Sequence, residues 1–138
     1  MFNCETDIIN YLKEQKNWKK HFPKYKIIGF EQYILGFLSR KIIGKVDIVF
    51  RARNKKYFAE VKYDKKQNIS DFWTALKVIG YVEAYKLFSF NRDVEPLIIV
   101  NKEVLTQECK TILYSLRISW IVFEISENKI KFDIQLNS

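Results

Sequence analysis

The segment from residue 44 to residue 63 carries acidic and basic side chains in a pattern that suits metal-assisted chemistry. It reads GKVDIVFRARNKKYFAEVKY, which predicts two apolar strands joined by a polar turn. Alternation along the strands places Asp47 on one face of the first strand, and Glu60 and Lys62 on one face of the second. If residues 54–55 form the centre of the turn, Asp47 lies opposite Lys62, and the three side chains converge on one face of the hairpin.

Two carboxylates and a lysine are suited to metal-assisted hydrolysis of a phosphodiester. Asp47 and Glu60 offer the oxygen ligands that Mg²⁺ prefers, and Mn²⁺ would substitute for it. The cation would hold a phosphate oxygen and lower the pKa of the attacking water, while Lys62 orients or deprotonates that water or neutralises charge on the phosphorane. The competing interpretation is an ordinary cross-strand ion pair between Asp47 and Lys62. We favour the active site because the polar trio interrupts strands otherwise built of Val, Ile and Phe.

The elements around this segment predict a single mixed α/β domain over residues 1–138. Helices are expected at residues 5–18, from an N-cap at Ser70 to about Phe90, and at residues 103–116. Residues 25–38 are expected to form a strand or a long bent hairpin, and further strands are expected at residues 44–52, 56–63, 97–100, 118–125 and 130–134. Helices and strands in this order form layers around one sheet.

The residues GKVDIV at 44–49, with Glu60 and Lys62 following Asp47 at thirteen and fifteen residues, resemble the motif of the PD-(D/E)xK nuclease superfamily. Val46 stands where the motif has proline. The superfamily includes restriction endonucleases, archaeal Holliday-junction resolvases and many phage and archaeal-virus nucleases. The resemblance implies a restriction-endonuclease-like αβββαβ core with a mixed central sheet, followed here by a C-terminal helix and a β-hairpin. It also implies that Asp47 and Glu60 are metal ligands and that Lys62 is the catalytic lysine. A homodimer is implied as well, because resolvases of this fold act as dimers.

The first predicted helix offers a third acidic side chain. Glu5 shares an arc of about 100° with Ile8, Ile9 and Leu12, and a carboxylate on a buried stripe needs a partner. By resemblance to superfamily members that carry such a glutamate, Glu5 would reach the metal directly or through water. The alternative is a first-turn acid favoured by the helix dipole.

The second predicted helix offers two further candidates for contact with substrate. Residues 81–85 (YVEAY) resemble the Gln-Leu-x-Ala-Tyr run of several superfamily exonucleases, with Tyr81 in place of the glutamine. Lys77 lies one turn earlier on the same side, so Lys77 or Tyr81 would contact phosphate or water there. The alternative, which we prefer, is an exposed Lys77 beside a core stripe. That stripe would comprise Trp73, Leu76, Gly80, Ala84 and Leu87.

The net charge of +8 is concentrated in one part of the chain. Residues 40–66 hold ten Lys or Arg and three Asp or Glu, a net +7, which favours a phosphate-facing surface and hence nucleic acid, most simply DNA. Arg51 shares a face with Asp47 in the predicted register, and Lys55 and Lys56 lie at the hairpin turn. These three side chains are therefore predicted to contact the substrate backbone.

Composition excludes several other classes of protein. Two cysteines are too few for a disulfide framework or a four-cysteine metal site. With no signal peptide and no apolar run of about 20 residues, we expect a cytoplasmic protein, in the host cell if it is viral, without a membrane span. The favoured function is a Mg²⁺-dependent endo- or exodeoxyribonuclease, with RNA cleavage left open. The alternatives are a catalytically inactive nucleic-acid-binding module on the same fold, and an interaction or structural protein.

Overall fold

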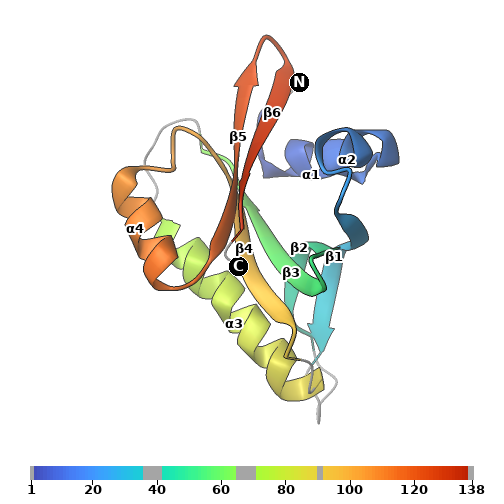
Figure 1. Ribbon diagram of the computed structural model, residues 1–138, viewed down its shortest axis with the longest axis vertical. Helices are drawn as coiled ribbons and strands as arrows, with labels where there is room; N and C mark the ends of the chain where they lie inside the picture. Colours follow the sequence, from blue (N-terminus) through green and yellow to red (C-terminus); the bar gives the residue numbers. More distant parts are fainter. Residues whose placement is uncertain (1, 36–41, 65–70, 90–91, 137–138) are drawn as a thin grey trace.

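The computed structural model of the protein describes residues 2–35, 42–64, 71–89 and 92–136. Within these ranges the chain forms four helices and one six-stranded sheet (Figure 1). The helices are α1 (Glu5–Lys13), α2 (Gln15–His21), α3 (Asp71–Ser89) and α4 (Gln107–Ser115). The strands are β1 (Lys26–Leu35), β2 (Ile42–Ala52), β3 (Lys55–Lys62), β4 (Val94–Asn101), β5 (Ser119–Ser126) and β6 (Lys129–Gln135). The predicted N-cap Ser70 lies outside the described residues.

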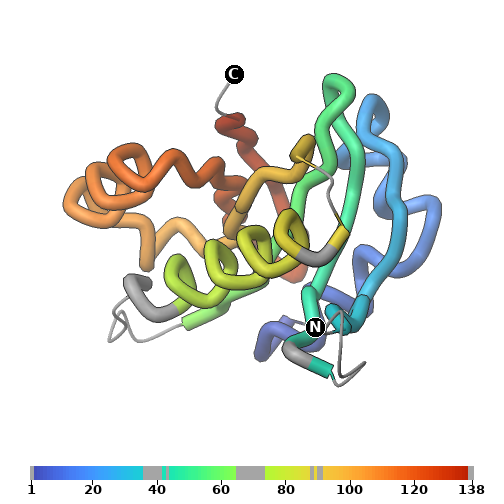
Figure 2. The backbone as a smooth tube through the Cα atoms, turned by 90° about the horizontal axis from the view of Figure 1, so that it is seen from below, coloured from blue at the N-terminus to red at the C-terminus, as the bar shows by residue number. Residues whose placement is uncertain are grey.

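The sheet is mixed, and its strands follow one another in chain order from β1 to β6. The central strands β3, β4 and β5 are parallel neighbours, whereas β1, β2 and β6 are antiparallel to theirs. Parallel neighbours require a crossover connection, and α3 and α4 provide the two crossovers on one face of the sheet, while α1 and α2 cover the other (Figure 1 and Figure 2). None of the helices in the described ranges is both long and apolar enough to span a membrane.

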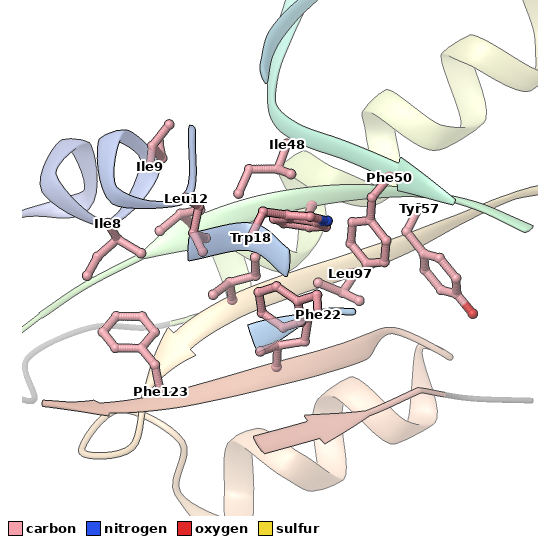
Figure 3. Close-up of a cluster of buried hydrophobic side chains, with 14 of the residues drawn as sticks. Ile8, Ile9, Leu12, Trp18, Phe22, Ile48, Phe50, Tyr57, Leu97 and Phe123 are labelled. Atoms are coloured by element: carbon pink, nitrogen blue, oxygen red, sulfur yellow. The ribbon is translucent and has the colours of Figure 1, made fainter. Parts of the chain in front are cut away.

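Both faces of the sheet are packed with apolar side chains. Beneath α1 and α2, the side chains of Ile8, Leu12, Trp18 and Phe22 meet the rings and aliphatic groups of the inner strands (Figure 3). Beneath α3 and α4, a second cluster includes Val49, Phe58, Val78, Val82 and Leu113. Strand β3 is therefore buried on both faces, and only the lysines at its two ends are partly exposed.

The predicted helix at residues 5–18 is wrong in its extent, because Glu14 adopts an extended conformation and separates α1 from α2. At about 100° per residue, a straight helix would place Trp18 roughly 240° around the axis from Leu12. The break lets both side chains face the same core, and the Trp18 indole N–H donates to the carbonyl of Tyr25 at 2.8 Å. Burial of a large ring thus outweighs continuity of the helix.

The register predicted for the β2–β3 hairpin is shifted by two residues. Arg53 and Asn54 form the turn, both with positive φ, as in a two-residue type I′ connection. Val49 consequently pairs with Phe58, and continuing that register places Asp47 opposite Glu60 rather than Lys62. A shift of two residues leaves every side chain on its predicted face, because the period of a strand is two.

The preferred core stripe on α3 is also wrong. Leu76 and Leu87 are exposed, as is Gly80, whereas the side chain of Trp73 lies outside the described residues. Among the side chains of this helix that the structure describes, those of Ala75, Val78 and Val82 are buried. Apolar residues occur on every side of this helix, so its periodicity does not define the buried face.

Two other boundaries differ from the prediction. Strand β4 begins at Val94, so Pro96 lies inside the strand, opposite Phe58 of β3, rather than before it. Helix α4 begins at Gln107 instead of residue 103, because the Thr106 hydroxyl caps it by accepting the N–H of Cys109 at 3.2 Å.

Truncating an apolar side chain should affect stability differently on the buried and the exposed face of α3. Val82→Ala should lower the free energy of unfolding by about 2 kcal/mol, because it removes two buried methyl groups and leaves a cavity. Leu87→Ala should change it by less than about 0.5 kcal/mol, because 67% of Leu87 is already exposed. Urea denaturation of both variants measures the difference, and equal losses would contradict the orientation of α3 described above.

Candidate active site

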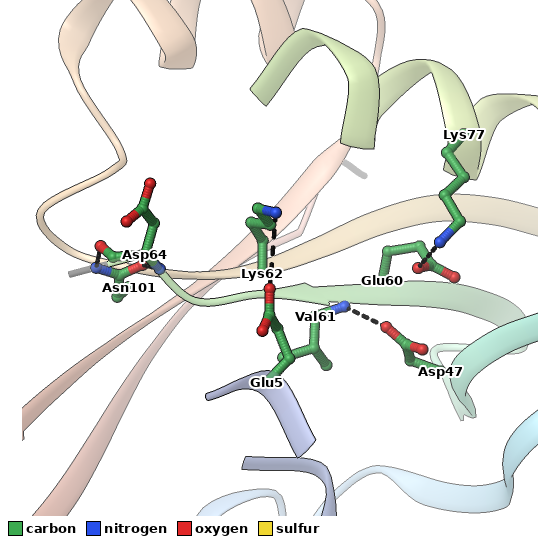
Figure 4. A network of polar contacts seen from close by, with 8 residues as sticks. All are labelled: Glu5, Asp47, Glu60, Val61, Lys62, Asp64, Lys77 and Asn101. Carbon is green, nitrogen blue, oxygen red and sulfur yellow. Dashed lines mark hydrogen bonds and ion pairs between the residues drawn. The ribbon is translucent and has the colours of Figure 1, made fainter. Parts of the chain in front are cut away.

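Asp47 lies where β2 separates from β3. Backbone pairing between these strands ends at Ile48 and Ala59, while β2 remains paired with β1. Beyond that point the Asp47 side chain replaces a backbone acceptor, and its Oδ2 accepts a hydrogen bond from the N–H of Val61 at 2.9 Å (Figure 4). This contact holds the Asp47 carboxylate beside Glu60, the residue that precedes Val61.

Glu60 is the one buried carboxylate in the described part of the chain, with 4% of its side chain exposed. Its Oε2 lies 3.3 Å from the Nζ of Lys77. Its Oε1 is buried and has no hydrogen-bond partner among the described residues. The Asp47 carboxylate is itself an acceptor and donates no hydrogen unless one of the two acids is protonated. Because burying such an atom costs free energy, Oε1 is well suited to accept a cation or a proton.

The electrostatics of this cluster follow from its burial. Burial and the neighbouring Asp47 charge raise the pKa of Glu60 to about 7, although the Lys77 ammonium opposes the shift. Burial lowers the pKa of Lys77, but the charge of Glu60 and the contact with it outweigh that effect and raise it. At neutral pH the two carboxylates therefore stay together only with a positive charge or a proton between them.

Lys62, which follows Val61 on β3, forms an ion pair with Glu5 of α1. The Nζ of Lys62 lies 3.6 Å from Oε1 of Glu5, and both side chains are about one-third exposed (Figure 4). The structure thus brings the predicted ligand Glu5 to the predicted catalytic lysine rather than to Asp47 and Glu60. In the described ranges, no three acidic, histidine or cysteine side chains are grouped to hold a metal ion. A metal-binding role for Glu5 stays a prediction, and it would require Glu5 to leave Lys62.

Lys77 and Tyr81 both face the site from α3. Lys77 is half exposed, but its ammonium reaches Glu60 and lies 5.8 Å from the centre of the Tyr81 ring. The Tyr81 ring packs directly against Gly44 of β2, where any added Cβ would overlap it. A glycine is therefore needed at this position for the ring to lie beside the strand that carries Asp47.

The three residues predicted to contact the substrate backbone differ in their surroundings. Arg51 is exposed on β2. Lys55 lies 3.7 Å from the carboxylate of Glu95, and Lys56 is half-buried, with its Nζ donating to the hydroxyl of Tyr85 at 2.9 Å. Lys55 and Lys56 therefore have partners within the protein, and Arg51 is the better placed of the three to meet a phosphate.

Sequence reasoning missed a buried asparagine that holds the end of β3. Asn101 is 2% exposed; its Oδ1 accepts from the N–H of Asp64 at 3.0 Å, and its Nδ2 donates to the carbonyl of Asp64 at 2.8 Å (Figure 4). The same Nδ2 also donates to Glu103 at 2.8 Å. The side-chain amide thus continues the pairing of β3 with β4 beyond Lys62. A polar residue directly after the apolar run 97–100 is the sequence signal that pointed to it.

The residues present fit a divalent cation. Asp47 and Glu60 offer hard oxygen ligands from adjacent strands, and Oε1 of Glu60 lacks a partner among the described residues. A cation between the carboxylates would remove the repulsion that raises the pKa of Glu60. The ammonium of Lys77 reaches Glu60 from α3, whereas that of Lys62, two residues further along β3, is paired with Glu5.

Solved structures with a similar fold are known, although no protein-family model and no curated protein sequence matches the chain. An fdxN element excision controlling factor protein from Anabaena variabilis matches with a TM-score of 0.60 at 19% identity, over 96% of this chain and 98% of that chain. An XisH family protein from Nostoc punctiforme matches with a TM-score of 0.60 at 15% identity, over 98% and 100%. A repair endonuclease from Pyrococcus abyssi matches with a TM-score of 0.58 at 16% identity, over 87% of this chain and 46% of that chain.

At these identities the likeness shows the fold alone. The six-stranded mixed sheet with helices on both faces is compatible with a restriction-endonuclease-like fold. The chain spans about half the length of the repair endonuclease that it matches, so the activity of that whole protein does not transfer with the fold.

The raised pKa of Glu60 predicts a stability that falls as pH rises. Between the ordinary value of 4.5 and about 7, the folded protein binds a proton that the unfolded chain has released. The free energy of unfolding should therefore drop across this window by an amount on the order of 3 kcal/mol, and then level off above pH 7. The measurement is urea denaturation in EDTA from pH 4.5 to 8, compared with Glu60→Gln, which cannot titrate there. Parallel profiles for the two proteins would contradict the assignment.

Proposed function

We propose that this chain is a divalent-metal-dependent nuclease of the PD-(D/E)xK superfamily that hydrolyses phosphodiester bonds in DNA. The observation that carries the proposal is the buried carboxylate of Glu60, which lies beside Asp47 and whose Oε1 has no partner among the described residues. A purely structural ion pair would satisfy both oxygens, whereas a metal ligand must keep one available. The fold shared with a repair endonuclease supports the same interpretation.

Each polar side chain of the site has a role in this proposal. Asp47 and Glu60 hold the cation, for which Mg²⁺ is suited and Mn²⁺ substitutes. When bound, the metal supplies Lewis-acid activation of the phosphate and a water of lowered pKa. Lys62 follows Glu60 by two residues on β3 and is paired with Glu5. In this proposal it orients that water or neutralises the charge that develops on the phosphate oxygens.

A row of cations across three strands supports a nucleic-acid substrate. Lys26 of β1 pairs directly with Arg51 of β2, and Arg51 pairs with Lys56 of β3. Like charges placed opposite one another destabilise an isolated sheet, so the row is better suited to an anionic backbone lying across it. Because Lys56 contacts Tyr85 of α3, the row lies on the same face of the sheet as Lys77 and Glu60.

The inactive nucleic-acid-binding module remains the alternative on the same fold. It shares the cation row but would have no use for a buried carboxylate with one oxygen left without a partner among the described residues. The two proposals differ in one observable, which is metal-dependent cleavage. The homodimer implied by the resemblance stays a separate prediction.

Asp47→Asn and Glu60→Gln should each lower Mg²⁺-dependent cleavage by about 100-fold or more, because the loss of a residue that only supports a metal ligand already costs roughly 10- to 100-fold. Both changes remove one charge and keep the side-chain shape, so the fold should be retained. The assay is a cleavage panel of nicked, linear, branched and single-stranded DNA and of RNA, with and without Mg²⁺. Glu108→Gln, an exposed change on α4, is the matched control and should cut like the wild type. A wild-type protein that binds DNA and cuts none of these substrates would favour the inactive module instead.

Binding to duplex DNA should be strongly salt-dependent and weakly sequence-dependent. The slope of log affinity against log salt concentration should be roughly −0.9 for each phosphate neutralised, so Arg51→Ala should flatten it by about one unit. Lys129→Ala, at the far hairpin between β5 and β6, should leave the slope unchanged. Titrations of two unrelated linear duplexes at several salt concentrations test this. A flat salt dependence, or a large preference for one duplex, would point to a different partner.

A further inference from the structure

Lys77 is the only cation that an ion pair places on the Glu60 carboxylate in the described part of the chain. Its Nζ lies 3.3 Å from Oε2, and the charges of both Glu60 and Asp47 act on it. Lys62, which the sequence motif marks as the catalytic lysine, instead pairs with Glu5. The two ammonium groups are therefore divided between different carboxylates, and Lys77 alone neutralises the buried one.

The buried carboxylate of Glu60, which lies beside the half-buried one of Asp47, requires a compensating charge, because an unpaired buried charge is strongly destabilising. An ammonium and a divalent cation meet that requirement in the same way, but both within a few ångströms of Glu60 would repel each other. The ion pair between Lys77 and Glu60 and a metal bound by Glu60 are thus alternatives for the same charge.

We propose that the Lys77 ammonium takes the place of the divalent cation on Glu60 while the metal is not bound, and that metal binding displaces it toward the phosphate. This inference rests on the proposed function of the site. Lys77 keeps the carboxylates of Asp47 and Glu60 together before the metal arrives. Once displaced, it is a positively charged group beside the metal, available to a phosphate oxygen.

The surroundings of Lys77 allow such a movement without unfolding any element. Half of its side chain is exposed (52%), and its flexible four-carbon stem extends from a helix anchored by the neighbouring buried Val78. The Tyr81 ring lies one turn further along α3, packed against Gly44, with its centre 5.8 Å from the ammonium. The face of that ring keeps an attractive surface near the lysine when Glu60 is taken by the metal.

The test is a thermodynamic cycle of metal binding by the wild type and by Lys77→Met. The variant has no ion pair to break, so it should bind Mn²⁺ more tightly. We expect a gain of roughly tenfold, because the energy of this partly exposed ion pair lies between those of typical surface and buried pairs. Isothermal titration calorimetry at pH 8.5, above the pKa of Glu60, measures the affinity without DNA. Without metal the variant should be less stable than the wild type, and Mn²⁺ should raise its melting temperature by more.

Two further variants separate this role from a general effect of charge. Lys77→Arg keeps the cation and should bind Mn²⁺ no more tightly than the wild type. Lys86→Met removes a lysine from the same helix, where it pairs with Glu83 at 3.8 Å, and should leave Mn²⁺ affinity unchanged. Equal or weaker binding of Mn²⁺ by Lys77→Met than by the wild type would overturn the displacement. Failure of every protein, the wild type included, to bind Mn²⁺ would overturn the proposed function as well.

Discussion

Burial of the Glu60 carboxylate beside that of Asp47 is the constraint on which the rest of the site depends. Two neighbouring like charges, one of them buried, repel each other. A backbone N–H that donates to Asp47 and the Lys77 ammonium paired with Glu60 compensate for this repulsion. These contacts compensate only in part, because Oε1 of Glu60 has no partner among the described residues and the pKa of Glu60 is raised to about 7. A site that tolerates such a cost is typical of function rather than of stability.

Glu60 is buried because β3 is an inner strand of the sheet. The strand is antiparallel to β2 on one side and parallel to β4 on the other, with helices over both faces. Where β2 leaves it, the Asp47 side chain takes over a backbone hydrogen bond, and past Lys62 the Asn101 amide holds the chain to β4. The end of β3 is therefore held by hydrogen bonds on both sides, and its polar side chains extend from a strand rather than from a loop.

Helix α3 brings the ammonium of Lys77 to this end of β3. As the crossover between two parallel strands, α3 packs on one face of the sheet. The burial of Val78 and Val82 sets the rotation of the helix about its own axis. That rotation turns Lys77 toward Glu60 and leaves Leu76 and Leu87 exposed. The packing of an apolar helix thus decides which lysine meets the buried carboxylate.

The sequence by itself determined the order of the elements and the face on which Asp47, Glu60 and Lys62 lie, because strand periodicity depends only on local geometry. It did not determine which two residues of the polar run 53–56 form the hairpin turn. It also did not determine the break at Glu14 or the buried side of α3, because both depend on packing against distant elements. The pairings of Lys77 with Glu60 and of Lys62 with Glu5 likewise belong to the tertiary structure. An ion pair between two elements depends on where each helix packs against the sheet. That packing depends on burial of the whole core, and a local sequence pattern does not specify it.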